Sequence, residues 1–316
     1  SLKWLGLDWD EGPVDVGGSG GELFTGQYKG DLGPYRQSER LAIYEKYLQE
    51  LVDKGFAYYC YCTKEELEGE RQAMLAQGLP PKYSGRCRAG KPKGVGESQL
   101  IRFKIPDVRM SFRDMIRGEI NFNAGLMGDI AIAKNLRTPL YNFAVVIDDH
   151  EMGITHVIRG EDHINNTPKQ ILFMEALGFS RPHYAHLSLI LDPDRSKMSK
   201  RYSATAIREY RDQGYLPEAL INFMVLLGWH SKEEKEIFSL EELVKEFDLS
   251  RAQKAGAVFN VEKLNWLNAQ YIKKLSEGEL AEKLNLSPSE QNIKIIKLGK
   301  ERMNKLSDFK NISSFF

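Results

Sequence analysis

The chain has 316 residues, and its 44 lysines and arginines balance its 44 aspartates and glutamates. With 42% hydrophobic and 28% charged residues, the composition is that of a folded globular protein and excludes a disordered or fibrous one. No run of about 18 apolar residues occurs, so the sequence predicts no membrane span. Zero net charge argues against a general affinity for nucleic acids, although local basic patches can still bind them.

The first residues carry no apolar segment of the signal-peptide type. The apolar residues of 2–7 have the pattern of a helix that ends near Gly6, so we expect the natural chain to begin upstream of residue 1. Three cysteines are too few for a disulfide framework, and the odd number favours a reducing cytoplasm.

Residues 11–34 are rich in glycine and are predicted to form a flexible loop. They are not a dinucleotide-binding fingerprint, because no strand precedes a G-x-G-x-x-G pattern there. A helix capped by Ser38 and ended by Gly55 is expected to follow.

Thr63 and Glu66 form a capping box that predicts a second helix, ending near Gly78. Short segments rich in aromatic and branched residues around this helix are predicted as strands. They are residues 56–61, 100–105 and 119–122.

The near-continuous apolar run 141–147 predicts a strand that is buried on both faces. Residues 156–158 and 187–191 are predicted as further strands, and the helix between them begins at 167–168 and ends at Gly178. Strand, helix and strand in this order predict a parallel sheet of the α/β type.

After residue 200 the pattern is helical. Pro217 begins a strongly apolar helix that ends at Gly228, and serine–glutamate capping boxes at Ser239 and Ser287 predict two more helices. The sequence thus predicts a mixed α/β part, a parallel-sheet core and a helical tail.

Residues 196–201 read Ser-Lys-Met-Ser-Lys-Arg and follow a turn signal at 192–194. Lysines on such a loop can close on a polyphosphate and neutralise charge that develops there. A lone K-x-S-K tetrapeptide is nevertheless more often a solvated basic loop.

Two polar segments follow predicted strands, where ligand sites of open α/β sheets lie. In residues 159–163, Arg159 can hold a carboxylate with two hydrogen bonds, and a surface salt-bridge cluster is an equal alternative. Residues 148–151, Asp-Asp-His-Glu, can bind Mg²⁺, but we favour a helix N-terminus with acidic residues.

Cys60, Cys62 and Cys87 offer three soft ligands for zinc, and the Tyr83 oxygen can be the fourth. From the spacing alone, three reduced thiols are the favoured interpretation, because tyrosine is a rare ligand. The basic stretch 82–104 beside this cluster has the charge to grip a nucleic-acid backbone.

Taken together, six strings of residues resemble a bacterial-type glutamyl-tRNA synthetase, a class I aminoacyl-tRNA synthetase, over nearly the whole chain. They occur in the family's order, at residues 2–7 with 10–13, 33–41, 141–150, 158–163, 196–201, and 214–220 with 227–229.

The resemblance implies an α/β fold with a Rossmann-type parallel-sheet catalytic core, formed by residues 1–35 and 140–192. An inserted α+β acceptor-stem-binding domain, residues 36–139, would split this core and carry the zinc site. A helical stem-contact domain with the Lys-Met-Ser-Lys signature would span 193–265, and a helical anticodon-binding domain would begin in 266–316.

The resemblance also implies roles for single residues. Lys197 and Lys200 match the catalytic lysines of the second class I signature, which stabilise the ATP phosphates. Cys60, Cys62 and Cys87 match a zinc pattern seen in part of the family, and with Ala89 where the fourth ligand is usually histidine, Tyr83 is expected to take its place.

For the amino acid, Arg159 matches a residue that binds the glutamate carboxylate, and Tyr141 matches a residue that lines the same pocket. Glu161 and His163 fall where the glutamate and the adenine of ATP meet, and are therefore expected to contact ATP.

Three features depart from the family pattern. The first class I signature is absent, residues 135–137 replace a usual Asp-Gly, and Tyr202 and Ser203 replace a usual His-Gly. The chain is therefore expected to be a fragment that is inactive by itself, with anticodon recognition lying beyond Phe316.

The activity implied is the ligation of L-glutamate to tRNA(Glu), with ATP and Mg²⁺, through a glutamyl-adenylate, by a cytoplasmic monomer. One alternative is the truncated paralogue that glutamylates a modified base of tRNA(Asp) and shares the cysteine pattern. Another is a non-catalytic tRNA-binding fragment. The long helical part after residue 201 favours the synthetase.

Overall fold

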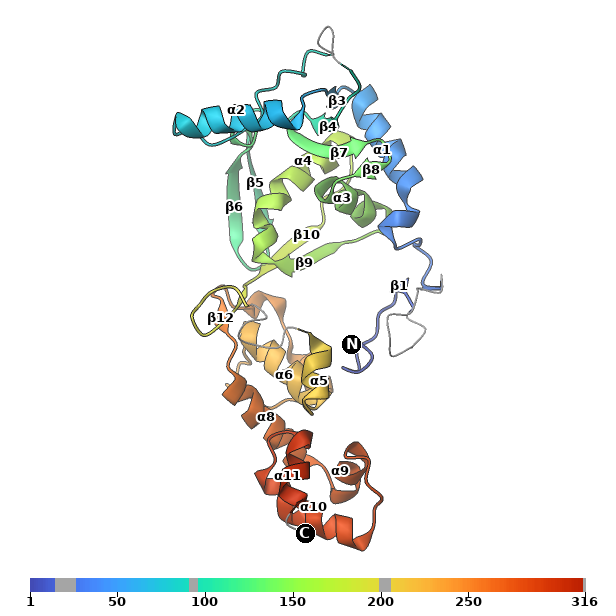
Figure 1. The fold of residues 1–316 in the computed structure, drawn as a ribbon, viewed down its shortest axis with the longest axis vertical. Helices are drawn as coiled ribbons and strands as arrows, with labels where there is room; N and C mark the ends of the chain where they lie inside the picture. The colour runs from blue at the N-terminus through green and yellow to red at the C-terminus, as the bar shows by residue number, and fades with distance from the viewer. Residues whose placement is uncertain (15–26, 91–95, 199–205, 315–316) are drawn as a thin grey trace. The chain divides into compact units, whose positions relative to one another are not determined.

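The computed structural model describes residues 1–14, 27–90, 96–198 and 206–314 (Figure 1). They form two compact units, which we call the sheet unit (residues 9–186) and the helical unit (residues 1–8 with 187–316). Within the described residues, no helix is long and apolar enough to cross a membrane.

The sheet unit contains two four-stranded sheets. The first has the order β3-β4-β7-β8 and is antiparallel throughout. Its strands are β3 (Ala57–Cys60), β4 (Leu100–Phe103), β7 (Ile130–Asn135) and β8 (Thr138–Pro139). The strands predicted at 56–61 and 100–105 are confirmed.

The second sheet has the order β6-β5-β10-β9. Its strands are β5 (Arg109–Asp114), β6 (Gly118–Asn123), β9 (His156–Gly160) and β10 (His183–Leu187). The predicted parallel pairing is present in part: β10 runs parallel to β5 with Tyr184 opposite Asp114, whereas β5 and β6 are antiparallel. Because β5 and β10 pair, this sheet joins strands from both sides of residue 140.

Four helices accompany these sheets, and α1, α3 and α4 pack on β3, β4 and β7 in one apolar core. Ring contacts such as that of Phe103 with Phe173, whose centroids lie 4.8 Å apart, fill this core. The helices are α1 (Leu41–Asp53), α2 (Lys64–Ala76), α3 (Tyr141–Glu151) and α4 (Thr167–Leu177). Short 3₁₀ turns lie at Gln37–Glu39, Ala124–Leu126 and Glu161–Asn166.

The strand predicted over residues 141–147 is wrong, because these residues form most of helix α3. A short apolar run does not distinguish a strand buried on two faces from a buried helix. The spacing of the buried residues Phe143, Ala144, Val146 and Ile147 is helical, and their common face lies in the apolar core.

The acidic segment 148–151 is accordingly not a helix N-terminus but the C-terminal end of α3. Successive positions of a helix point in different directions, and these side chains do not converge on one ion. Asp148 accepts hydrogen bonds from Arg40, which precedes α1, and from Tyr44 of α1. Glu151 accepts one from Tyr47, and His150 stacks on Phe179.

Helix starts depend on local capping. The capping box of Thr63 and Glu66 is present and begins α2, as predicted. Ser38 does not cap α1, because it lies inside a 3₁₀ turn and Arg40 occupies the cap position without a side-chain bond.

In the glycine-rich segment 11–34, β1 (Gly12–Pro13) and β2 (Tyr28–Lys29) pair antiparallel. Residues 15–26 of this segment lie outside the described residues.

The helical unit confirms the predicted helical tail, with two short strands that pair in parallel. The strands are β11 (Ile190–Leu191) and β12 (Ala257–Val258). The helices are α5 (Ile207–Asp212), α6 (Pro217–Gly228), α7 (Leu240–Glu246), α8 (Val261–Lys274), α9 (Glu277–Lys283), α10 (Glu290–Gly299) and α11 (Phe309–Ser313). Short 3₁₀ turns lie at Leu249–Arg251, Lys300–Arg302 and Leu306–Asp308.

Three sequence predictions in this unit were inexact. Ser289 caps α10 in place of Ser287, and the strand predicted over 187–191 is the end of β10 followed by the separate strand β11. Residues 2–6 form a turn, closed at Gly6 with a φ of 72°, that buries Leu5 against the core of the helical unit.

The buried ion pair of Arg40 and Asp148 ties α1 to α3. Arg40 is 1% exposed and its Nε lies 2.7 Å from Asp148 Oδ1, which also accepts a 2.7 Å hydrogen bond from the Tyr44 hydroxyl. Since a buried charge without its partner is strongly unfavourable, Asp148→Ala is expected to lower the free energy of unfolding by about 3–5 kcal/mol.

Urea denaturation measures this effect, with Glu45→Ala as the control. Glu45 pairs with Arg137 at the surface, so its loss is expected to cost less than about 1 kcal/mol. Equal effects of the two variants would contradict the importance of the buried pair.

Candidate functional site

Arg159 lies near the end of β9, and its guanidinium is held along one edge by uncharged groups. Nε donates to His186 Nε2 at 3.1 Å, and Nη2 donates to Thr167 Oγ1 at 2.7 Å and to Gln170 Oε1 at 2.8 Å. Among the described residues, no carboxylate lies within ion-pair distance of Arg159 and Nη1 has no hydrogen-bond acceptor. A half-buried arginine in this state is suited to bind a carboxylate from outside the protein.

His186 on β10 and Asp114 on β5 stand behind Arg159, and both side chains are fully buried. The imidazole Nδ1 lies 2.6 Å from Asp114 Oδ2. Burial lowers the pKa of His186, although the hydrogen bond with Asp114 opposes this shift. Burial alone would raise the pKa of Asp114, but hydrogen bonds from Arg117 N–H, His186 and Ile116 N–H lower it.

The other predicted pocket residues lie around the same strand end. The Tyr141 hydroxyl, at the start of α3, is 3.4 Å from Nδ1 of His163 in the turn after β9. Glu161, in the same turn, forms an ion pair of 2.7 Å with Arg117, whose Nε donates to the carbonyl of His186. The structure therefore brings Tyr141, Arg159, Glu161 and His163 together at one end of β9.

Asp149 of α3 adds a half-buried carboxyl group near Arg159. Burial raises the pKa of Asp149 from its ordinary 3.8 to about 6; the charge of Arg159 opposes the shift and the charge of Asp148 adds to it. This carboxyl group therefore changes its charge within the experimentally accessible pH range.

Lys197 belongs to the helical unit and follows the predicted turn. The turn is present: Arg195 has a φ of 65° and its N–H donates to Asp192 O, while Ser196 N–H donates to Asp194 Oδ1. The backbone of Lys197 then pairs with that of Leu191 in an isolated antiparallel β-bridge. This pairing fixes the position of the first lysine of the signature. Lys200, Tyr202 and Ser203 lie outside the described residues.

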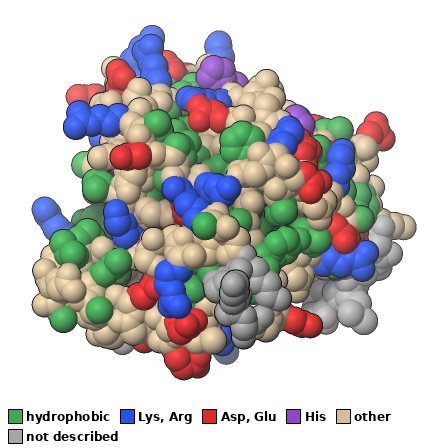
Figure 2. All heavy atoms as spheres, turned by 90° about the horizontal axis from the view of Figure 1, so that it is seen from above, with side chains coloured by type: hydrophobic (Ala, Val, Ile, Leu, Met, Phe, Trp, Pro, Cys, Tyr) green, Lys and Arg blue, Asp and Glu red, His purple; other side chains and the backbone are tan. Residues whose placement is uncertain are grey.

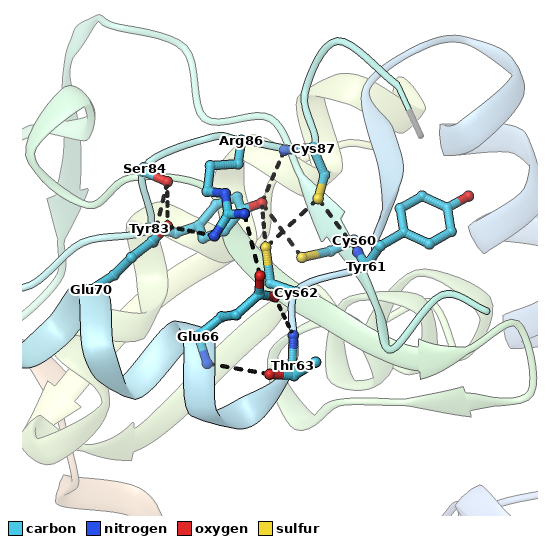
Figure 3. Close-up of polar contacts among 10 residues, drawn as sticks. All are labelled: Cys60, Tyr61, Cys62, Thr63, Glu66, Glu70, Tyr83, Ser84, Arg86 and Cys87. Carbon is cyan, nitrogen blue, oxygen red and sulfur yellow. Dashed lines mark hydrogen bonds and ion pairs between the residues drawn. The ribbon is translucent and has the colours of Figure 1, made fainter. Parts of the chain in front are cut away.

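Cys60, Cys62 and Cys87 gather at the end of β3, with their sulfur atoms within 4.8 Å of one another (Figure 3). The Tyr83 hydroxyl lies 3.5 Å from the sulfurs of Cys60 and Cys62, and the sulfurs of Cys62 and Cys87 are 3.7 Å apart. A tetrahedral zinc ion with ordinary bond lengths separates two sulfur ligands by about 3.8 Å, and a sulfur from an oxygen by about 3.5 Å. The three separations given above match those expected around such an ion.

Local structure holds this cluster together. The capping box of Thr63 and Glu66 fixes the chain directly after Cys62, and the Arg86 guanidinium reaches Glu66 at 3.3 Å and Glu70 at 3.6 Å. These contacts bind the loop that carries Tyr83 and Cys87 to helix α2 (Figure 3). The four ligand atoms are therefore positioned by contacts that need no metal.

A buried arginine lies against the cluster. The guanidinium carbon of Arg102 lies 3.9 Å from the centre of the Tyr83 ring. Burial alone would raise the pKa of Cys60, but the hydrogen bonds of Tyr83 and Arg102 and the charge of Arg102 lower it. Burial raises the pKa of Cys62 to about 11, although its hydrogen bond with Tyr83 opposes the shift. Arg102 thus favours the thiolate form that binds metal.

The arginines of the basic stretch 82–104 are used within the fold. Arg88 forms an ion pair with Asp129 at 2.8 Å, and Arg86 and Arg102 make the contacts described above. On the face that Figure 2 shows, basic and acidic side chains are interspersed rather than gathered by sign. The described side chains on this face therefore form no continuous basic surface.

Five further residues surround the predicted pocket and were not predicted as part of it, namely Asp114, Arg117, Thr167, Gln170 and His186. They lie on β5, α4 and β10 and in the turn after β5, far from Arg159 in the sequence, and none belongs to a local motif. A polar histidine within an apolar strand was the one available signal.

Comparison with known proteins relates this chain to the class I tRNA synthetases. The profile of the family described as "tRNA synthetases class I (E and Q), catalytic domain" matches residues 1–266. The glutamate–tRNA ligase of Carboxydothermus hydrogenoformans is 50% identical over 289 residues, which are 89% of this chain and 58% of that protein. The corresponding ligase of Natranaerobius thermophilus is 49% identical over 294 residues, 91% of this chain and 57% of that protein.

Solved structures similar to this chain belong to the same family. The glutamate tRNA ligase of Elizabethkingia meningosepticum, solved in complex with its amino acid, is 35% identical and superposes with a TM-score of 0.84 over 99% of this chain and 68% of that one. The glutamate-tRNA synthetase of Elizabethkingia anophelis gives the same identity and TM-score. The chain spans a little more than half the length of the curated relatives it matches.

The raised pKa of Asp149 predicts a dependence of stability on pH. Between pH 3.8 and about 6 the folded protein keeps a proton that the unfolded chain releases, so the contribution of Asp149 becomes less favourable as pH rises. Asp149→Asn removes this ionisation and is expected to raise the free energy of unfolding at pH 8 by about 1–3 kcal/mol.

Urea denaturation of both proteins at pH 5 and pH 8 measures the effect. The gain from the substitution is expected to be smaller at pH 5, where the wild-type carboxyl group is largely protonated. A gain that is equal at both values would contradict the raised pKa.

Proposed function

Because this chain belongs to the class I tRNA synthetases of the E and Q type, we propose that it takes part in the ATP-dependent ligation of L-glutamate to tRNA(Glu). The reaction proceeds through a glutamyl-adenylate: a glutamate carboxylate oxygen attacks the α-phosphate of ATP, and pyrophosphate leaves. The 3′-terminal ribose hydroxyl of the tRNA then attacks the activated carbonyl, and AMP leaves. Such chemistry asks the protein mainly for positioning and charge stabilisation.

The state of Arg159 carries this proposal. Its guanidinium is oriented by three uncharged acceptors, Nη1 has no acceptor among the described residues, and no described carboxylate forms an ion pair with it. An anionic substrate group can therefore pair directly with an arginine that is already in place and whose charge the nearby Asp149 carboxyl group offsets only from a distance. Tyr141 and His163 border this site and suit the remainder of a small amino acid and the base of ATP.

Lys197 and Lys200 would stabilise the phosphates of ATP, together with Mg²⁺, as the pyrophosphate leaves. Glu161 would lie beside the adenosine moiety and is held in place by Arg117. We further propose that residues 36–139 bind the acceptor stem, that residues 193–265 contact the stem region, and that residues 266–316 begin an anticodon-binding domain. The reduced cysteines suit the cytoplasm, and we expect the protein to act there. We also expect it to act as a monomer.

Glutamate-dependent exchange of pyrophosphate into ATP by the full gene product, with and without tRNA(Glu), tests the proposal. Arg159→Lys keeps the charge but loses the planar set of donors. It is expected to raise the KM for glutamate about 100-fold and to leave the KM for ATP within about threefold of the wild-type value.

Arg113→Lys is the matched control, because Arg113 lies exposed on β5 of the same sheet and is expected to be silent. A wild-type protein that shows no exchange in the presence of tRNA(Glu) would contradict the proposed function. Exchange that needs no tRNA would favour the paralogue that modifies tRNA(Asp).

We also propose that Cys60, Cys62, Cys87 and Tyr83 hold a structural Zn²⁺. The separations of their ligand atoms support this proposal, and a structural zinc would supply folding energy rather than reaction chemistry. Tyr83→Phe removes one ligand atom and leaves the ring against Arg102. It is expected to weaken zinc binding at least tenfold, as measured by competition with a chromophoric chelator.

Tyr61→Phe is the control, because the Tyr61 ring points away from the three sulfurs (Figure 3). Equal zinc affinities of the Tyr83 variant and the wild type would exclude the tyrosine oxygen as a ligand. They would leave the three thiolates as the complete set of protein ligands.

A further inference from the structure

A chain of buried polar groups extends from β5 through β10 to Arg159. Asp114 ends β5, its carboxylate contacts the imidazole of His186 on the neighbouring strand β10, and the imidazole reaches Arg159 on β9. Both Asp114 and His186 are fully buried, and nothing in the reaction proposed above requires either to contact a substrate. Burying a carboxylate and an imidazole together is costly unless they serve an interaction that the fold or the function needs.

The hydrogen-bond chemistry fixes the direction of this chain. Arginine offers donors alone, so the Nε2 atom that faces Arg159 Nε at 3.1 Å must be an acceptor. The single proton of the neutral ring is then on Nδ1, which donates to Asp114 Oδ2 at 2.6 Å. Thr167 fits the same scheme, since its hydroxyl accepts from Arg159 Nη2 and lies 3.2 Å from Nε2.

We infer that Asp114 and His186 are positioning residues for glutamate recognition: Asp114 selects the histidine tautomer whose lone pair holds Arg159. This inference rests on the proposed role of Arg159 in binding the substrate carboxylate. The arrangement orients the guanidinium without neutralising it, because the neutral ring separates the arginine from the carboxylate of Asp114. A carboxylate in the place of His186 would pair with Arg159 and compete with the substrate.

Substitutions of His186 test this inference more cleanly than those of Asp114, because Asp114 Oδ1 also accepts the backbone N–H groups of Ile116 and Arg117 in the turn between β5 and β6. His186→Gln can place an amide oxygen near the position of Nε2. His186→Asn is too short to reach Arg159 but can still place an amide near Asp114. The pair therefore separates contact with Arg159 from contact with Asp114.

Titration calorimetry of the full gene product with L-glutamate measures the outcome. His186→Asn is expected to raise the Kd for glutamate about tenfold, since it removes an acceptor from a charged donor, and His186→Gln is expected to stay within about threefold of wild type. His183→Gln, an exposed position on the same strand, is the control and is expected to bind as the wild type does.

Each outcome bears on a different claim. Wild-type binding that His186→Asn leaves unchanged would overturn the inference alone. Equal losses in the two His186 variants would also overturn it, because they would show that the imidazole acts by filling the core. A wild-type protein that binds no glutamate would overturn the proposed function and, with it, the inference.

The histidine tautomer provides a readout that a space-filling role would not require. In ¹⁵N-histidine NMR spectra at pH 7, His186 is expected to carry its proton on Nδ1 and an unprotonated Nε2. Asp114→Asn is expected to reduce the population of this tautomer. A wild-type ring protonated on Nε2 would overturn the inference without reference to any substrate.

Discussion

The charge of Arg159 is the constraint on which the arrangement of the sheet unit depends. Other arginines of this unit pair with carboxylates, for example Arg40 with Asp148 and Arg88 with Asp129. Arg159 instead donates its hydrogen bonds to uncharged acceptors alone. A half-buried cation of this kind costs free energy in the unliganded protein, and an anionic ligand recovers part of that cost. The packing of α4 against both sheets provides the rigidity that maintains this unfavourable arrangement.

Two adjacent residues of helix α3 have different surroundings, one in the contact with α1 and the other near the predicted pocket. Asp148 is oriented toward α1, where it completes the buried pair with Arg40, whereas Asp149 lies near Arg159 and Tyr184. Neighbouring positions on a helix differ by about 100° in direction, so one turn can present charges to two environments. The stability of the α1–α3 contact and the electrostatic potential at Arg159 are therefore coupled through the placement of one helix.

Local signals in the sequence predicted local structure well. The capping boxes at Thr63 and Ser239, the proline at the start of α6 and the closing Gly178 each act over a few residues, and each is confirmed. The clustering of Cys60, Cys62, Cys87 and Tyr83 is confirmed as well, because the capping box and the salt bridges of Arg86 act within the same short stretch of chain. The apolar run 141–147 was predicted wrongly because Tyr141 and Val145, which lie outside the buried face, are apolar as well and hide the helical spacing of the buried residues.

The remaining part of the site was beyond sequence reasoning for a physical reason. His186 and Asp114 are 72 residues apart and meet because β10 pairs in parallel with β5. This pairing depends on the tertiary packing of the sheets and α4 and not on local sequence. Arg159, which is proposed to bind the substrate carboxylate, lies in a motif that is recognisable because its neighbouring groups are close in the sequence. The residues that fix its protonation and orientation come from wherever the tertiary fold supplies a buried partner. In this chain the recognisable motif therefore supplies Arg159, and long-range strand pairing supplies the groups that hold it.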